Sequence, residues 1–177
     1  MIGGNMLRKI IIALGIFICF VLQTTLFKFL ALGNIAPNLL LMLTFFVGFI
    51  RGKKEGVYVG FFSGLLIDIC YGRVIGFNAL LLMYIGFLNG AFNKMYYDDE
   101  VTLPMGLVCI SDFIYNFVFY VFQFLLRARL SFGYYLIHII IPEMVYTVII
   151  TFVFYKLFLK INSTIEKYEK GSAPSFD

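Results

Sequence analysis

Charged residues are scarce in this chain. Only 14% of its 177 residues are Asp, Glu, Lys or Arg, whereas about a quarter of a soluble domain is charged. Apolar residues make up 62% of the chain, and its mean hydropathy is +0.94. A soluble globular protein is excluded because too few polar residues remain to cover its surface, and a disordered chain is excluded because it needs low hydrophobicity. We therefore predict one small integral membrane domain.

Cysteine, histidine and catalytic motifs are scarce too. Cys19, Cys70 and Cys109 stand singly in apolar runs without a Cys-x-x-Cys pair, so we interpret them as packing residues and predict neither disulfides nor a metal site. The sequence has no GxSxG, HExxH or phosphate-binding loop, which argues against an enzyme and against a bound cofactor. The net charge of +4 comes mostly from clusters beside apolar runs, which indicates topology signals rather than a nucleic-acid surface.

Six long apolar runs follow one another along the chain. They cover residues 10–27, 35–50, 56–71, 77–92, 101–126 and 134–159. Their residues are apolar on every side instead of alternating with polar ones, which predicts transmembrane helices rather than strands. The first run is long for a signal peptide and ends in polar residues, so we interpret it as a retained helix. The sequence predicts an all-α membrane protein in which residues 1–160 form one compact bundle of six transmembrane helices.

Proline and charge mark the ends and the breaks of these runs. Pro37 and Asn38 open the second run, and the basic stretch 51–55 closes it. Pro142 lies inside the sixth run, where it removes a backbone donor and is expected to kink the helix. Residues 161–177 are predicted to be a cytoplasmic tail. Its first part either lies as an amphipathic turn on the membrane surface or continues the sixth helix into solvent.

Basic residues are distributed unevenly between the two predicted sides. Ten of the 14 Lys and Arg residues lie at the N-terminus, after the second and fourth runs, or at the C-terminal end. The other four are Lys28, Arg73, Arg127 and Arg129. Because loops rich in Lys and Arg stay in the cytoplasm, we predict that both termini face the cytoplasm, which requires an even number of spans.

Glycines recur at helical spacing in the third and fourth runs. Gly56, Gly60 and Gly64 fall on one helix face, and Gly86 and Gly90 repeat the spacing. Small residues at every fourth position let two helix backbones approach closely in a membrane. We favour packing within the chain as their role, with a face for a partner helix as the alternative.

Four ionisable side chains lie inside apolar runs: Asp68, Asp112, Glu143 and His138. An acid at bilayer depth costs at least about 2.5 kcal/mol, so each is expected to face the bundle interior, a cavity or a partner. Counting residues from the helix ends puts Asp112 and Glu143 at one depth. The same count puts Asp68 and His138 at another.

Two interpretations of these intramembrane residues remain open. They form either a proton or ion relay or a hydrogen-bonded structural network, in which the neighbouring polar residues take part: Asn78, Tyr115, Asn116 and Tyr146. The structural network is favoured because no continuous polar path crosses the predicted bilayer.

One part of the chain resembles a known family. The residues that carry the resemblance are Pro37, Asn38, Arg51, Gly52, Gly56, Gly60, Gly64, Asp68, Gly72, Gly76, Phe77, Asn78, Ala79 and Leu80. Together they resemble the MreD family of bacterial rod-shape-determining membrane proteins, over about residues 35 to 92. The C-terminal half is similar only in hydropathy and number of spans, so its carboxylates receive no family role.

The resemblance implies a non-enzymatic subunit of the cell-elongation machinery in the cytoplasmic membrane. Its expected partner is a bitopic MreC-like protein, through which it engages MreB filaments, the glycosyltransferase RodA and a transpeptidase during lateral wall synthesis. The family is also similar in fold to the six-helix substrate-binding subunits of energy-coupling-factor vitamin transporters. A membrane solute-binding subunit is therefore the alternative, and it requires a cavity lined by polar groups such as Asp68, Asn78 and His138.

Overall fold

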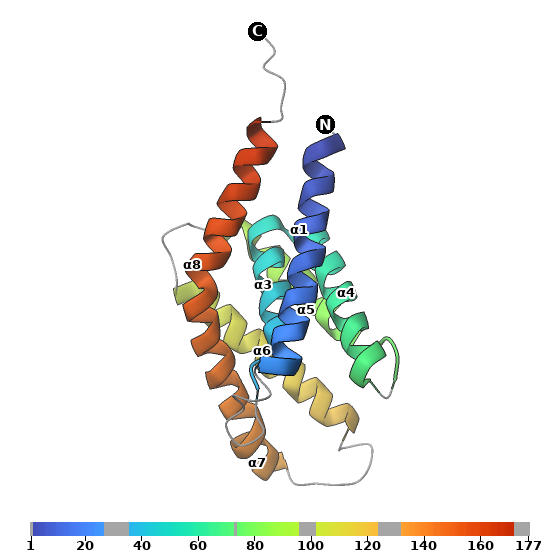
Figure 1. Ribbon diagram of the computed structural model, residues 1–177. Helices are drawn as coiled ribbons and strands as arrows, with labels where there is room; N and C mark the ends of the chain where they lie inside the picture. The colour runs from blue at the N-terminus through green and yellow to red at the C-terminus, as the bar shows by residue number, and fades with distance from the viewer. Residues whose placement is uncertain (1, 27–35, 73, 96–101, 124–131, 172–177) are drawn as a thin grey trace.

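The chain folds into helices throughout the residues that a computed structural model describes, which are 2–26, 36–72, 74–95, 102–123 and 132–171 (Figure 1). The helices are α1 (Ile2–Val21, continued by a π-helical turn Leu22–Leu26), α3 (Leu39–Arg51), α4 (Lys53–Tyr71), α5 (Phe77–Ala91, followed by a 3-10 turn Phe92–Met95), α6 (Thr102–Gln123), and α7 (Phe132–Tyr135) joined through a π-helical turn (Leu136–Ile140) to α8 (Ile141–Gly171). Counting the last three segments as one, there are six helices and no strand among these residues. The all-helical prediction is confirmed for this part of the chain.

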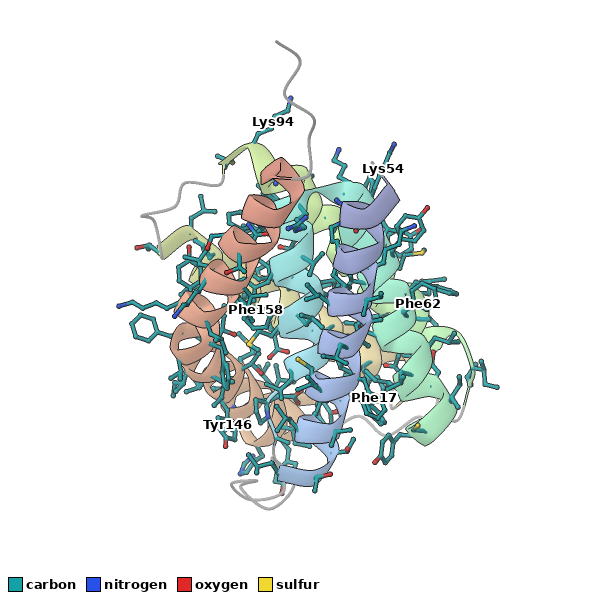
Figure 2. The ribbon with its side chains drawn as sticks, turned by 45° about the horizontal axis from the view of Figure 1, so that its top comes forward. Phe17, Lys54, Phe62, Lys94, Tyr146 and Phe158 are labelled. Carbon is teal, nitrogen blue, oxygen red and sulfur yellow. The ribbon has the colours of Figure 1, made fainter. Side chains whose placement is uncertain are left out.

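Successive helices run in alternating directions. The start of α1 and the end of α8 consequently lie at the same end of the molecule (Figure 1). Lys54 and Lys94 lie toward this end as well (Figure 2). Arg8 of α1 forms an ion pair there with Glu55 of α4, with 3.0 Å between nitrogen and oxygen. We call this the basic end of the molecule.

The boundaries on either side of Gly52 and at the start of α3 differ from those predicted. The second helix begins at Leu39 rather than 35, because Asn38 is its N-cap and Pro37 precedes the cap. The expected basic loop 51–55 is absent, since α4 starts at Lys53 and only Gly52 separates it from α3. Gly52 has φ +96°, a conformation that glycine adopts without the strain a Cβ atom would bring. The chain therefore reverses direction within a single residue.

Pro142 stands directly after a π-helical turn. Because proline has no backbone N–H, the carbonyl oxygen of His138, four positions earlier, loses its usual donor. His138 lies inside the π-helical turn Leu136–Ile140, where the helix is already wider than an α-helix. The expected disturbance of the sixth span thus takes the form of a π-helical turn. Beyond it α8 continues to Gly171, so the described part of the predicted tail is an extension of this helix.

Helix α3 is the centre of the bundle. Ten of its 13 residues are buried, on every face of the helix, as is typical of a helix surrounded by other helices. Phe45 stacks on Phe49, and Phe46 stacks on Phe158 of α8 with ring centroids 4.6 Å apart. By contrast, only 6% of the residues in the apolar window of α1 are buried, so α1 lies against the outside of this core.

Three helices are long and apolar enough to cross a bilayer by length and composition. They lie within 8–26, 102–122 and 133–164. Helix α3, with 13 residues, is shorter than the roughly 20 residues that a membrane span requires. The start of α3 is buried in the bundle, so its first backbone nitrogens are expected to need polar partners there.

Candidate functional site

The carboxylate of Asp68 holds the turn between α4 and α5. Its Oδ2 accepts hydrogen bonds from the backbone nitrogens of Gly76 (2.9 Å) and Ala79 (3.0 Å). Its Oδ1 accepts from the backbone nitrogen of Asn78 (3.1 Å) and from the Asn78 side-chain amide (2.8 Å). With only 1% of Asp68 exposed, four donors surround one buried carboxylate. The first turn of α5 is thereby capped by a side chain of the preceding helix, where the helix dipole favours a negative charge.

Two glycines give this turn its shape. Gly76, the N-cap of α5, has φ +99° and supplies no side-chain cap of its own. Gly72 ends α4 with its backbone nitrogen bonded to the carbonyl oxygens of Ile67 and Asp68. A Cβ atom at Gly72 would lie 2.6 Å from the Asp68 carbonyl oxygen. A side chain at either position would distort the turn.

The network reaches α6 through Asn78. The Tyr115 hydroxyl donates to Asn78 Oδ1 at 2.7 Å, and both side chains are buried. Asp68, Asn78 and Tyr115 thus link three helices by hydrogen bonds that leave the carboxylate saturated with donors. This arrangement suits a fixed structural acceptor, since a relay group needs a partner to which it passes a proton.

Glycines allow the helices around this network to touch. The glycines of α4 face α5, so that a Cβ atom at Gly56, Gly60 or Gly64 would lie closer than 3.0 Å to the α5 backbone, a separation that real Cβ atoms essentially never show. Gly86 and Gly90 of α5 meet α4 in the same way. In the described structure these glycines therefore form a contact between α4 and α5 of the same chain. Close packing of the two backbones stabilises such a contact in a membrane, where a hydrophobic driving force is missing.

A second polar cluster lies between α6 and α8. Asp112 is fully buried, and neither of its carboxylate oxygens has a hydrogen bond of good geometry. The Thr147 hydroxyl and the Glu143 carboxyl are its polar neighbours, and the Asn116 amide lies beside Glu143. The depth-based pairing of Asp112 with Glu143 agrees with this placement.

The depth-based pairing of Asp68 with His138 is wrong. His138 is exposed on the π-helical turn, with its Nδ1 3.1 Å from the Tyr134 carbonyl oxygen and its ring stacked on Tyr134. Asp68 takes its hydrogen bonds from the α4–α5 turn instead. Depth along a helix specifies a level but not the face on which a residue lies, and these two residues lie on faces that do not meet. Tyr146, also expected in the network, packs at the edge of the aromatic cluster around α3.

Partners at both ends of α3 were not found from the sequence. At its start, Asn38 Oδ1 accepts from the Leu41 nitrogen (3.1 Å) and Gln23 Oε1 accepts from the Leu40 nitrogen (3.1 Å). The backbone nitrogen of Asn38 donates to the Thr147 hydroxyl of α8 at 3.2 Å. These caps come from three separate parts of the chain. They satisfy backbone nitrogens that the first turn of a helix leaves without partners.

Asparagines four residues apart perform related tasks. The side-chain amide of Asn93 donates to the carbonyl oxygens of Phe49 (2.9 Å) and Ile50 (2.6 Å), which caps the C-terminal end of α3. Asn89 donates to the Ser111 hydroxyl of α6 at 2.8 Å. The sequence shows these two amides four residues apart beside an apolar run, which indicates buried polar contacts. It does not indicate which groups accept their hydrogen bonds.

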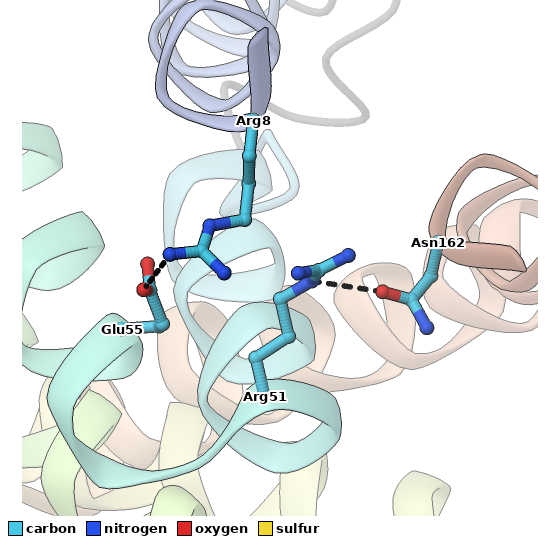
Figure 3. Close-up of polar contacts among 4 residues, drawn as sticks. All are labelled: Arg8, Arg51, Glu55 and Asn162. Carbon is cyan, nitrogen blue, oxygen red and sulfur yellow. Dashed lines mark hydrogen bonds and ion pairs between the residues drawn. The ribbon is translucent and has the colours of Figure 1, made fainter. Parts of the chain in front are cut away.

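Further contacts join the helices at the basic end. Besides the Arg8 to Glu55 pair, Arg51 Nε of α3 donates to Asn162 Oδ1 of α8 at 2.9 Å (Figure 3). Within the described residues no group of three or more His, Cys, Asp or Glu side chains is placed to hold a metal ion. The two contacts at the basic end thus connect α1 with α4 and α3 with α8.

Comparison with known proteins assigns the family. A family model described as rod shape-determining protein MreD matches residues 5–163, which is most of the chain and includes the Asp68 network and the greater part of each of the six helices. Searches of curated proteins and of solved structures found no significant match. The apolar helices agree with a membrane location. The chain therefore belongs to the MreD family of rod shape-determining membrane proteins.

Proposed function

We propose that this protein is a non-enzymatic subunit of the bacterial cell-elongation complex that binds an MreC-like bitopic protein in the cytoplasmic membrane. Through that partner it connects with MreB filaments, RodA and a transpeptidase, and so helps to organise lateral peptidoglycan synthesis. The observation that carries the proposal is the family match over residues 5–163. The polar residues described above support a scaffold, because their hydrogen bonds tie helices to one another.

The scaffold has a rigid part and a looser part. Helices α3, α4 and α5 are joined by glycine contacts and by the hydrogen bonds of Asp68 and Asn93. Helix α1 packs loosely beside them. A closely packed unit with exposed apolar faces suits a subunit that positions a second membrane protein, since association in a membrane depends on shape and close packing.

We further propose that all six helices cross the membrane and that the basic end faces the cytoplasm. The alternating helix directions and the common position of the start of α1 and the end of α8 support an even number of crossings (Figure 1). Arg8, Arg51 and Lys54 all belong to the side predicted to be rich in basic residues, in keeping with the rule that basic loops remain inside.

Co-purification tests the function. The full-length protein, carrying an affinity tag, is extracted from its native membrane in mild detergent, and the recovered proteins are identified by mass spectrometry. A bitopic MreC-like protein is expected with the wild type and with the conservative variant Asp68→Asn. Recovery of a transporter ATPase module without an MreC-like protein would contradict the proposal.

The alternative of a vitamin-binding subunit gains no support from the placed residues. Asp68 and Asn78 are buried and bonded to each other, whereas His138 is exposed on another helix. Two grooves flank α1, and neither is lined by any of these three residues. Saturable binding of a vitamin by the purified protein would nevertheless overturn the scaffold proposal.

A further inference from the structure

We propose that the groove between α1 and α4 is a binding site for an anionic phospholipid, which places an acyl chain along the groove and its phosphate at the basic end. The groove encloses about 670 Å³. It begins between Lys9 and Glu55 and continues along α4 as far as Ile69. The site is separate from the polar networks inside the bundle.

The groove has the length and the lining of an acyl-chain site. From Glu55 to Ile69 it follows α4 for about 21 Å, at 1.5 Å per residue, whereas one leaflet of the hydrocarbon core is about 15 Å thick. Its walls are apolar along this length, formed by Ile12 and Ile16 of α1 and by Phe62 of α4, among others. A chain that enters at the basic end therefore stays in contact with protein through the depth of one leaflet.

The charge at the mouth of the groove is positive. Glu55 is the acid at the rim, and Arg8 forms an ion pair with it at 3.0 Å (Figure 3). Lys9, also at the rim, is exposed. Lys54 follows in the first turn of α4 and is exposed too. A basic rim above an apolar groove between two membrane helices is complementary to a lipid phosphate attached to an acyl chain.

The walls suit a flexible chain better than a partner helix. Close packing of a second helix needs small residues at the contact. The glycines of α4 are already used against α5, and the groove side of α4 carries large side chains such as Tyr58, Phe62 and Leu65. An acyl chain can follow such an uneven surface, whereas a helix would contact only the projecting rings.

The absence of tryptophan makes the occupant measurable. The chain has no Trp residue, so Tyr58→Trp introduces a single fluorophore in the groove wall, at a side chain that is 63% exposed. Phe152→Trp on α8, also 63% exposed, is the matched control outside the groove. Each full-length variant is reconstituted in phosphatidylcholine vesicles with increasing fractions of brominated phosphatidylglycerol, and in a parallel series with brominated phosphatidylcholine, and the quenching of Trp fluorescence is measured.

We expect the Tyr58→Trp variant to select phosphatidylglycerol over phosphatidylcholine by about fivefold or more, as one basic residue near a phosphate provides. The Phe152→Trp variant should show a preference close to one. Adding Lys9→Gln to Tyr58→Trp should remove most of the preference, whereas adding Lys156→Gln, an exposed lysine of α8, should leave it unchanged. Adding Ala13→Phe, which fills the groove wall, should reduce quenching by either lipid.

Three results would overturn the inference. One is an equal preference at the groove and at the control position, which would indicate general surface charge. Another is a preference that survives Lys9→Gln. The third is a Tyr58→Trp fluorophore that neither lipid quenches, which would indicate that no acyl chain enters the groove. Because the vesicles hold only the purified chain, none of the three results bears on binding of an MreC-like protein.

Discussion

Replacing Asp68 by leucine should severely destabilise the protein. The substitution removes the acceptors of four hydrogen bonds and leaves three donors buried without partners, namely the backbone nitrogens of Asn78 and Ala79 and the Asn78 side-chain amide. One unsatisfied buried donor costs about 1 to 3 kcal/mol. Three such donors therefore correspond to a loss of at least about 3 kcal/mol, which is a large fraction of the stability of a typical domain.

Replacing Asp68 by asparagine should cost less. One oxygen remains and keeps the bonds from Gly76 and Ala79, while the new amide group faces Asn78. The Asn78 side chain can then turn its oxygen toward residue 68, and the Tyr115 hydroxyl can accept from the Asn78 amide instead of donating to it. The Asn78 backbone nitrogen and the Tyr115 hydroxyl are then left without an acceptor, so the expected loss is at least about 2 kcal/mol, still below that of leucine, which leaves more donors unpaired.

Thermal unfolding in detergent separates these variants. The monodisperse fraction of tagged protein is followed by size-exclusion chromatography after heating, with membrane abundance and cell shape scored in parallel. At about 2 to 4 °C per kcal/mol for a chain of this size, Asp68→Leu should lower Tm by at least about 6 °C or yield little folded protein. Asp68→Asn should melt between it and the wild type and should support rod growth at least partly. A Tm for Asp68→Leu within about 2 °C of the wild type would refute the reasoning, and loss of rod growth in Asp68→Asn at normal abundance would favour a proton relay.

Three further tests address the topology, the glycine contacts and the second acidic cluster. In a variant without the native cysteines, Val74→Cys should react with an impermeant thiol reagent applied to intact cells. Lys54→Cys should not react, since the basic end is proposed to face the cytoplasm. The opposite labelling would contradict the six-span topology. Gly60→Leu should abolish folding, because the leucine side chain would clash with the α5 backbone. Gly106→Leu on α6, where a Cβ atom has nothing within 4 Å, should leave Tm within about 2 °C of wild type. Equal effects of the two substitutions would argue against the close contact. Asp112→Asn should retain abundance and cell shape, because its polar neighbour, the Thr147 hydroxyl, can donate to an amide oxygen as well as to a carboxylate. Loss of shape at normal abundance would instead indicate that Asp112 must ionise.

The sequence determined the helices and the local part of the site. Apolar runs of this length must become helices in a bilayer because a helix satisfies its own backbone groups, so the six helices lie close to the predicted runs. The contact of Asp68 with its turn was also predictable, since Gly76 and Asn78 lie only 8 and 10 residues further along the chain. The spacing of the glycines indicated a face for close packing, because residues four apart share one side of a helix.

Only the tertiary structure decided which faces meet. Hydropathy and depth along a helix do not specify how the helix is rotated about its axis. For this reason His138 does not contact Asp68 as expected, whereas Tyr115 donates a hydrogen bond to Asn78. The caps of α3 depend in the same way on partners distant in sequence, such as Thr147, which is 109 residues from Asn38. In an apolar chain almost any helix face can be buried. Two conditions determine which faces are buried: glycines must let helix backbones approach closely, and buried polar groups must find hydrogen-bond partners. Both conditions are met only when all the helices are in place.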